Sequence, residues 1–323
     1  MSERAEHESG WRRALAPAKV NLTLDVLGRR ADGYHELDTT MVALGLADVL
    51  GARRMPRTGL ALRLSGPHAG GIPGDERNLA WRAAAAVLDA AERAGALGRG
   101  CGLELELAKE IPDQAGLGGG SSDAAAALLA AEAALGFELD ARARRAVLAE
   151  LGSDCVFFLE AAATGFARCR GRGEQVEPWA PVFQEWSVAL IAPEVRVPTA
   201  AVYAALGRSL YTLPRAPNVR ASPLSSSEHD ARAALRNALE PAALALFPDL
   251  RAWRRLLDEC GASHFRLCGS GSSFFGLYRS AEQAALELAA IETLARSRGT
   301  STAMKLRGSW TAPLAGHGAR VLP

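Results

Sequence analysis

Polar and apolar residues alternate in several short stretches of the chain, a pattern that predicts half-buried β-strands. The alternation covers residues 20–26, 60–64 and 103–107, and a further strand-like run covers residues 39–46. The Asp32-Gly33 pair between the first and the last of these runs is a turn signal. We therefore expect two neighbouring strands joined by a turn, followed by two further strands.

Runs rich in alanine and leucine predict helices between the strands. One helix follows Asn78, and a second follows the glycines at 118–120. A third helix starts at about Asp140 and stops at Gly152. On the local pattern alone, Asp154 is interpreted as a cap of the helix that comes next.

After Gly165 the pattern changes to hairpins that alternate with helices. The expected elements are a hairpin with its turn at residues 170–173, a strand from Trp186, a helix over residues 197–206 and a long surface loop over residues 212–230. They continue with a helical stretch over residues 231–261 that breaks near Glu240 and Pro241, two strands joined by a GSGS turn over residues 264–278, and a last helix over residues 281–296. This mixture predicts an α+β fold.

The length of 323 residues suits two domains of about 150 residues each. We expect them at residues 1–165 and 166–323, with a disordered lead over residues 1–16. Lys and Arg number 37 against 36 Asp and Glu, so the charge indicates neither nucleic acid nor a membrane as a partner. The first residues lack the apolar region of a signal peptide, and the five cysteines show no CxxC spacing. We expect a soluble, cytoplasmic protein without a disulfide framework or a structural zinc site.

The stretch IPDQAGLGGGSSDAAAALL, residues 111–129, places four glycines and two serines directly before a run of strong helix formers. The first turn of a helix carries unpaired amides and a partial positive charge, so this junction predicts an anion site that suits phosphate. A flexible linker is the alternative, although linkers seldom lead straight into a long helix. The loop lacks the GKS or GKT ending of a Walker A loop, so a cation must come from elsewhere. The chain has only three lysines, Lys19, Lys109 and Lys305.

Three blocks of the sequence resemble, in this order, the three motifs of the GHMP kinases: PAKVNLTLDVLGRRADGYHEL, the glycine stretch above, and LCGSGSSFFGLY. The resemblance covers residues 17–278. It implies an N-terminal domain like the second domain of ribosomal protein S5, a ferredoxin-like C-terminal domain, and a site in the cleft between them. Within the family, DGYHEL indicates kinases that use ATP and Mg²⁺ to phosphorylate the 2-hydroxyl of a cytidine-diphosphate-linked methylerythritol in non-mevalonate isoprenoid biosynthesis. A monomer or a homodimer is expected.

The resemblance also implies roles for individual residues. Lys19 and Asp154 match the catalytic pair of the family. Tyr34 and Tyr203 would sandwich the cytosine while His35 hydrogen-bonds its edge. The residues expected near ATP are Asn78, Lys109, Ala115, Gly116, Leu117, Gly118, Gly119, Gly120, Ser121 and Ser122, with Ser122 also a metal ligand. The further residues expected near the substrate are Asn21, Gly269, Ser270 and Gly271.

Without the resemblance, several of these residues have plainer interpretations. An exposed Tyr34-His35 pair at the exit of a turn is more often ordinary surface than a binding site. Two other functions also remain open. One is a GHMP kinase for mevalonate, homoserine or a sugar, against which DGYHEL argues. The other is a catalytically silent nucleotide-binding homologue, against which the presence of Lys19 and Asp154 argues.

Overall fold

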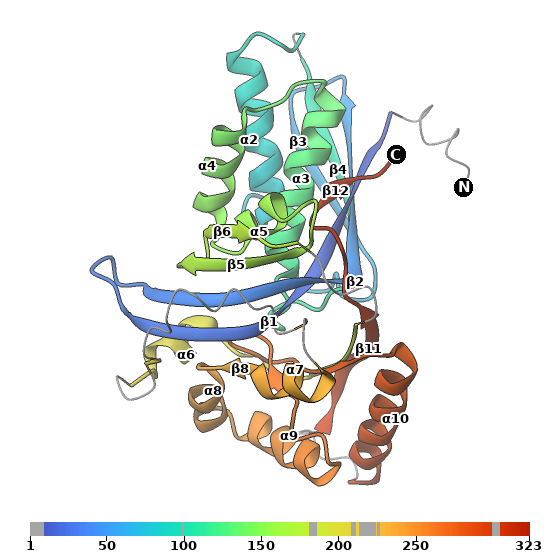
Figure 1. Cartoon of the computed structure of the whole chain (residues 1–323). Helices are drawn as coiled ribbons and strands as arrows, with labels where there is room; N and C mark the ends of the chain where they lie inside the picture. Colours follow the sequence, from blue (N-terminus) through green and yellow to red (C-terminus); the bar gives the residue numbers. More distant parts are fainter. Residues whose placement is uncertain are drawn as a thin grey trace.

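The computed structural model describes residues 10–98, 100–180, 186–207, 211–212, 224, 227–298 and 304–323. They form two sheets with helices on each, which confirms the α+β prediction (Figure 1). No helix among these residues is long and apolar enough to cross a membrane. All five cysteines are free thiols, as their spacing predicts.

The first sheet has eight strands among the described residues, in the order β12-β1-β2-β4-β3, with β5 beside β2, β6 beside β5 and β8 beside β1. Their bounds are β1 Arg12–Arg29, β2 His35–Met55, β3 Gly59–Ser65, β4 Gly102–Ala108, β5 Phe166–Gly171, β6 Gln175–Pro178, β8 Arg236–Asn237 and β12 Arg320–Val321. The turn predicted at Asp32-Gly33 joins β1 to β2, and Gly33 takes a positive φ of 88° there. The result is a long antiparallel ribbon that crosses the molecule (Figure 1).

The beginning of the chain corrects one expectation. Residues 1–9 lie outside the described residues, but β1 begins at Arg12, so residues 12–16 form a strand instead of a disordered lead. Ala14 and Ala16 are fully buried, and Ala14 lies opposite Leu50 on β2 and Val321 on β12. The burial of these small side chains between two partner strands holds this segment in the sheet.

Four helices pack together on this sheet: α2 Leu79–Arg93, α3 Gly119–Leu135, α4 Ala141–Leu151 and α5 Cys155–Glu160. α3 lies at the centre, against β1 and β2 on one side and α2 and α5 on the other. It is buried nearly all round, which explains its long alanine run, because small side chains let the neighbouring elements approach closely. This burial fixes the direction in which the N-terminus of α3 points.

The second sheet has the order β11-β7-β10-β9, with β7 Ser187–Pro193, β9 Arg266–Leu267, β10 Phe274–Tyr278 and β11 Leu306–Pro313. The helices of this half are α6 Thr199–Ala204, α7 Glu228–Ala234, α8 Glu240–Leu246, α9 Pro248–Glu259 and α10 Ala281–Ser297. α10 packs on β7, β10 and β11, and α9 packs on α10. The predicted hairpins and the last helix are therefore present. Most of the loop predicted at residues 212–230 lies outside the described residues, although α7 starts within it.

The break predicted near Glu240 and Pro241 in the helical stretch over residues 231–261 lies a few residues earlier, since Glu240 and Pro241 begin α8 instead. The short strand β8 separates α7 from α8, because the side chain of Asn237 bonds to neighbouring backbone instead of extending a helix. Its amide donates to the carbonyl oxygens of Leu267 and Gly269, both at 2.7 Å, and its Oδ1 accepts from the amide of Leu239 at 2.9 Å. Asn237 thereby fixes the backbone of the late glycine loop.

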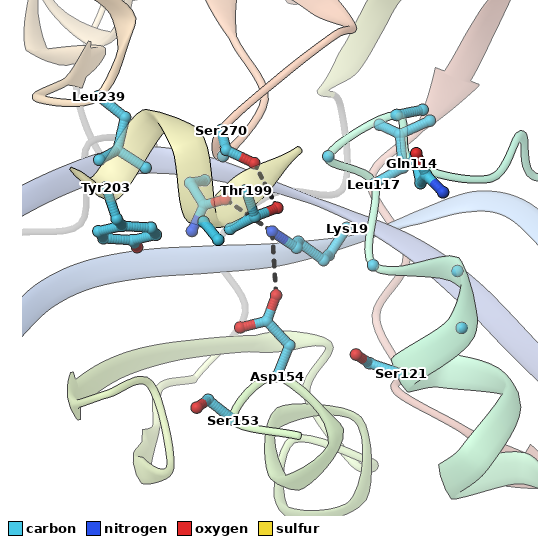
Figure 2. A pocket seen from close by; sticks show the side chains of 18 of the residues that line it. Lys19, Gln114, Leu117, Ser121, Ser153, Asp154, Thr199, Tyr203, Leu239 and Ser270 are labelled. Carbon is cyan, nitrogen blue, oxygen red and sulfur yellow. Dashed lines mark hydrogen bonds and ion pairs between the residues drawn. The ribbon is translucent and has the colours of Figure 1, made fainter. Parts of the chain in front are cut away.

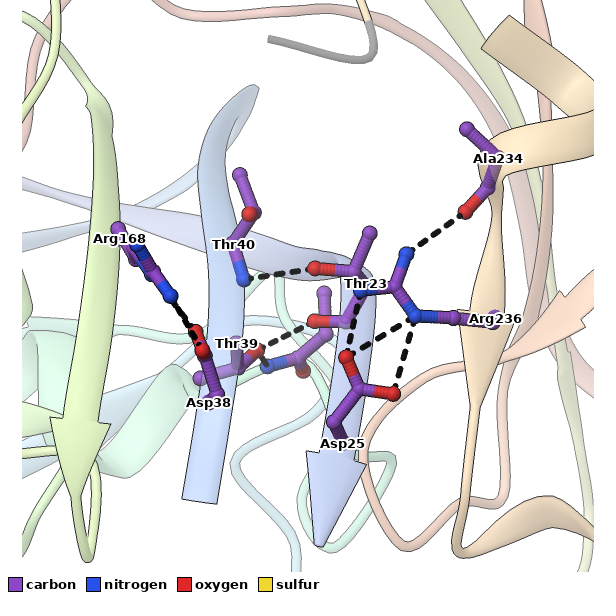
Figure 3. A network of polar contacts seen from close by, with 9 residues as sticks. Thr23, Asp25, Asp38, Thr39, Thr40, Arg168, Ala234 and Arg236 are labelled. Atoms are coloured by element: carbon purple, nitrogen blue, oxygen red, sulfur yellow. Dashed lines mark hydrogen bonds and ion pairs between the residues drawn. The ribbon is translucent and has the colours of Figure 1, made fainter. Parts of the chain in front are cut away.

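Charged side chains tie neighbouring strands of the first sheet together around the ribbon (Figure 3). Arg236 on β8 donates from Nε to both carboxylate oxygens of Asp25 on β1 at 3.0 Å. On β2, Asp38 accepts from Nε of Arg168 on β5 at 2.8 Å. These bidentate pairs fix planar groups in one geometry and brace both strands of the ribbon.

The boundary expected at residue 165 stays a prediction. Both β5 and β6, which follow it, belong to the first sheet, and so does β12 at the other end of the second half. The segment before β12 also packs on α5: the amide of Gly318 donates to Ala162 O at 3.1 Å, and that of Ala319 donates to Phe158 O at 2.9 Å. The two sheets therefore divide the structure more clearly than one boundary in the sequence does.

A half-buried histidine in the second half predicts a pH dependence of stability. Burial, followed by the charges of Arg232, Arg266 and Arg254, lowers the pKa of His264 to about 4, and its ring lies 3.0 Å from the hydroxyl of Tyr278. An unfolded histidine takes up its proton near pH 6.5, so between there and about pH 4 the unfolded chain binds more protons than the folded one. We expect the free energy of unfolding to fall as the pH falls through this window. Urea titrations at several pH values measure it.

A His264→Gln variant supplies the control, because glutamine can still bond to Tyr278 but does not titrate. We expect its stability to depend less steeply on pH in the same window. An identical slope in both proteins would contradict the assignment.

Candidate functional site

A cavity of about 1090 Å³ lies along the β1–β2 ribbon, where the two sheets meet (Figure 2). Its walls come from the ribbon, the glycine loop before α3, the start of α5, the helix α6 and the β9–β10 turn. The predicted site residues that line it are Lys19, Asn21, Tyr34, His35, Asn78, Lys109, Ala115, Gly116, Leu117, Gly118, Gly119, Gly120, Ser121, Asp154, Tyr203, Gly269 and Ser270. Two predicted residues, Ser122 and Gly271, do not line it.

The glycine loop presents bare backbone at the start of α3, as predicted. Gly118 is the residue that caps the helix, with a φ of 72° and no side-chain hydrogen bond, so neither Ser121 nor Ser122 acts as the cap. A Cβ on Gly118 would lie 2.9 Å from Cγ of Lys19, which explains why glycine is needed. The first-turn amides of α3 are thus free of a side-chain cap and available to an anion.

Lys19 and Asp154 form an ion pair in the middle of the cavity, 3.2 Å from Nζ to Oδ2 (Figure 2). Nζ of Lys19 also donates to Oδ1 of Asn21 at 2.8 Å, and the amide of Asn21 donates to the hydroxyl of Thr39 at 2.8 Å. Lys19 is only 4% exposed, whereas the side chain of Asp154 is 30% exposed. The lysine is therefore fixed by its neighbours, and the carboxylate faces the open cavity.

Asp154 does not serve as the helix cap that its local pattern suggests. It precedes α5 but has a helical backbone conformation, and its side chain makes no capping hydrogen bond. Because no helix amide uses the carboxylate, it can act in the cavity. The packing of α5 on α3 fixes the position of its backbone.

Lys109 lies at the cavity wall but its ammonium is fully engaged. It is 2% exposed and pairs with two carboxylates, Asp48 on β2 and Asp123 on α3, the latter at 2.6 Å. Burial lowers the pKa of Lys109, but the two carboxylates outweigh it and raise the pKa above its usual value. Asp48 also accepts from the amides of Glu110 and Ile111 at 2.6 and 2.8 Å. This charged triad fixes the segment that leads into the glycine loop.

Asn78, the other residue expected near adenine, also has structural partners. Its Oδ1 caps α2 by accepting from the amide of Ala80 at 2.9 Å, and its amide donates to Pro73 O at 2.9 Å. It fixes this rim of the cavity, and its contact with ATP stays a prediction.

The two glycine loops touch each other backbone to backbone. A Cβ on Gly116 would lie 2.0 Å from the carbonyl oxygen of Cys268, and the amide of Ser273 donates to Ala115 O at 3.1 Å. In the late loop, the hydroxyls of Ser270 and Thr199 on α6 lie 2.8 Å apart (Figure 2). The late loop thus completes the cavity from the second half of the chain.

The far end of the cavity is aromatic. The rings of His35 and Tyr203 lie 5.1 Å apart at 32°, and the ring of Tyr211 lies edge-on to His35, 6.1 Å away. Burial, and then the charge of Arg29, lowers the pKa of His35, which favours the neutral imidazole. Tyr34 is 55% exposed and lies under the guanidinium of Arg172. The cytosine sandwich stays a prediction, because His35 rather than Tyr34 contacts Tyr203.

Sequence reasoning missed several residues of the cavity. The pattern gave no role to Asp48, Asp123, Arg29, Arg172 and Tyr211, of which all but Asp48 line the cavity. Asp123 directly follows the two serines of the glycine loop, so its place in that motif was a usable signal. Asp48 and Arg29 reach the site through strand register, and Arg172 reaches it through the hairpin turn between β5 and β6. Tyr211 reaches it from a segment beside β1, where the amide of Thr212 donates to Val26 O at 2.8 Å.

Two side-chain oxygens next to the glycine loop are candidate ligands of a metal ion. Ser122 Oγ and Asp123 Oδ1 are buried without a hydrogen-bond partner among the described residues. Asp123 lines the cavity, whereas Ser122 does not. The described part of the chain has no cluster of three or more His, Cys, Asp or Glu side chains that could hold a metal by themselves. These hard oxygens fit Mg²⁺ only as a supplement to phosphate and water ligands, which is how Mg²⁺ usually binds.

Comparison with known proteins gives two matching family models. The model of the GHMP kinases N terminal domain matches residues 78–161, and the GHMP kinases C terminal model matches residues 219–295. The first match contains the glycine loop and Asp154.

Two curated relatives carry the same name, 4-diphosphocytidyl-2-C-methyl-D-erythritol kinase. The protein from Pelotomaculum thermopropionicum is 38% identical over 274 residues, which is 84% of this chain and 90% of the relative. The protein from Paracoccus denitrificans is 39% identical over 278 residues, which is 84% of this chain and 89% of the relative.

Solved structures agree with this likeness. A crystal structure of 4-(cytidine 5′-diphospho)-2C-methyl-D-erythritol kinase superimposes with a TM-score of 0.71 at 36% identity and covers 94% of this chain and 99% of its own. A homoserine kinase from Cytophaga hutchinsonii gives a TM-score of 0.68 at 19% identity and covers 97% of this chain and 98% of its own. The second likeness concerns the fold alone.

Proposed function

This chain belongs to the GHMP kinases, among the 4-diphosphocytidyl-2-C-methyl-D-erythritol kinases, and on that basis we propose that it transfers the γ-phosphate of ATP to the 2-hydroxyl of 4-diphosphocytidyl-2-C-methyl-D-erythritol. The reaction would be a step of non-mevalonate isoprenoid biosynthesis. The single observation that carries the proposal is the Lys19–Asp154 ion pair in a cavity that the glycine loop also lines.

The residues divide the work as follows. The uncapped amides at the start of α3 would bind the phosphates of ATP. Asp154 would orient the acceptor hydroxyl and accept its proton as the bond to phosphorus forms, and Lys19 would offset charge on the transferred group. A loose phosphoryl-transfer transition state needs positioning and charge neutralisation more than a strong base, which suits this pair.

Magnesium would accompany ATP and neutralise the charge on its phosphates. We propose Ser122 as its protein ligand, supported by the lack of a hydrogen-bond partner for the buried Oγ, although the residue does not line the cavity. Ser121 does line the cavity and would contact the phosphates directly.

We also propose a cytoplasmic location, supported by the five free thiols, since disulfides are rare in reducing compartments. A monomer or a homodimer stays the prediction for the assembly.

Release of ADP from purified protein tests the function. With ATP and Mg²⁺, we expect turnover with the cytidyl diphosphate substrate and none with methylerythritol phosphate, mevalonate or homoserine. The reason is that the aromatic end of the cavity offers a base site that the smaller alcohols would leave empty. Turnover with mevalonate or homoserine instead would overturn the substrate, and no turnover with any of them would favour the silent homologue.

A further inference from the structure

The hairpin turn between β5 and β6 contacts both the aromatic end and the middle of the cavity. The guanidinium of Arg172 lies over the ring of Tyr34, 4.8 Å from its centroid. The next residue, Gly173, passes Asp154 so closely that a Cβ on it would lie 3.5 Å from Oδ1 of Asp154 and 3.4 Å from Cβ of Ser153. The turn thus lies between the residues proposed to hold the base and the residue proposed to act on the hydroxyl.

The conformation of the turn is itself specific. Gly173 has a φ of 120°, which L side chains rarely adopt, and Gly171 has a φ of 73°. The amide of Arg172 donates to the carboxylate of Glu174 at 2.6 Å. The two glycine conformations and the hydrogen bond to Glu174 fix the backbone of Arg172, and its side chain lies over Tyr34.

A count of charges in the cavity singles out Arg172. Among the described residues that line the cavity, Lys19 and Lys109 are paired with buried or half-buried carboxylates. Arg77 is held by Asp75, with both Nε and a terminal nitrogen donating to the carboxylate at 2.9 and 2.7 Å.

Two arginines of the cavity remain. Arg172 has a distant contact of 3.9 Å with Glu174, whose carboxylate is already engaged by backbone. It also interacts electrostatically with Asp32, whose carboxylate accepts from Arg30 and from the amide of Tyr34.

Arg29 has no ion pair in the described part of the chain. Arg29 lies opposite His35 in the ribbon and is exposed. Arg172 is therefore the partly buried guanidinium of the cavity that is available to an anion beside Tyr34.

We propose that Arg172 binds the diphosphate of the substrate and so determines specificity for a nucleoside diphosphate. The inference rests on the proposed function, because the diphosphate of that substrate joins the base to the sugar alcohol that is phosphorylated. A guanidinium suits the task, since its planar donors bind phosphate oxygens in pairs while its face stacks on an aromatic ring. Arg172 would thus couple recognition of the diphosphate to the position of Tyr34.

Binding measurements with CDP and cytidine test the proposal without turnover. With the ATP site filled by a non-hydrolysable ATP analogue, we expect wild-type protein to bind CDP more tightly than cytidine. An Arg172→Gln variant should lose about 10- to 100-fold in affinity for CDP, the range for a charge-assisted hydrogen bond, and retain its affinity for cytidine. Arg172→Lys should recover part of the loss.

Arg170 provides a matched control on the same hairpin. It is half exposed, pairs with Glu177 at 3.5 Å and does not line the cavity. Arg170→Gln should leave the affinities for CDP and cytidine unchanged.

The outcomes separate the two proposals. Equal CDP affinity in wild type and Arg172→Gln would overturn the role of Arg172, and so would an equal loss of CDP and cytidine binding, since the arginine would then act only through Tyr34. If wild-type protein binds neither CDP nor cytidine, the proposed function itself fails.

Discussion

Replacing Asp154 with asparagine is expected to lower kcat about a thousandfold, within the range of about 10²–10⁴ that positioned general bases contribute. Asparagine has nearly the same shape but cannot accept the proton of the substrate hydroxyl. It also removes the ion pair with Lys19, which keeps its hydrogen bond to Asn21. Steady-state rates of ADP release measure the loss.

Binding of ATP should survive this change, because the glycine loop and α3 do not depend on the carboxylate of Asp154. Calorimetric titration with ATP checks that. An Asp258→Asn variant is the control, since its carboxylate pairs with Arg254 on α9, outside the cavity. If Asp154→Asn turns over at the wild-type rate, the proposed mechanism is wrong.

The Lys109→Met variant is expected to lose about 3–5 kcal/mol of the free energy of unfolding, the usual cost of removing one partner from a buried ion pair. Methionine is unbranched like lysine and nearly as long, but it leaves Asp48 and Asp123 with no cation between them. Burial already raises the pKa of Asp123 well above its usual value. Urea titration measures the change in the unfolding free energy.

Two comparisons make that test specific. Adding Asp123→Asn to Lys109→Met removes one of the stranded charges and should recover part of the lost stability. Arg63→Met removes an exposed cation that pairs with Glu104 and Glu106, and should cost less than about 1 kcal/mol. A loss as small as that in Lys109→Met itself would contradict the structural importance of the triad.

The sequence predicts the parts of this fold whose signals are local. Alternation at residues 20–26 and the Asp32-Gly33 turn correctly predict the ribbon, and the glycine run at 118–120 correctly predicts the start of α3. Each of these features depends on a few neighbouring residues. Their backbone preferences and burial agree, so tertiary contacts do not override them.

Features that depend on distant partners could not be predicted in this way. Lys109 meets Asp48 only because β2 and β4 pair in one particular register. Asn237 breaks a sequence of good helix formers because carbonyl groups of the late glycine loop lie within its reach. Arg172 gave no signal at all, since Tyr34 is remote in sequence and their contact exists only once the sheet has formed.

The packing of residues 314–321 on α5 and β1 has a consequence for synthesis of the protein. Ribosomes make a chain from its N-terminus, so Lys19 and Asp154 emerge long before the segment that bonds to Ala162 and Phe158. A nascent chain can therefore form the strands around Lys19 early, but the helix that follows Asp154 gains this support only after residues 318 and 319 have left the ribosome. Asp154 thus receives its final support from a part of the chain made about 160 residues later than itself.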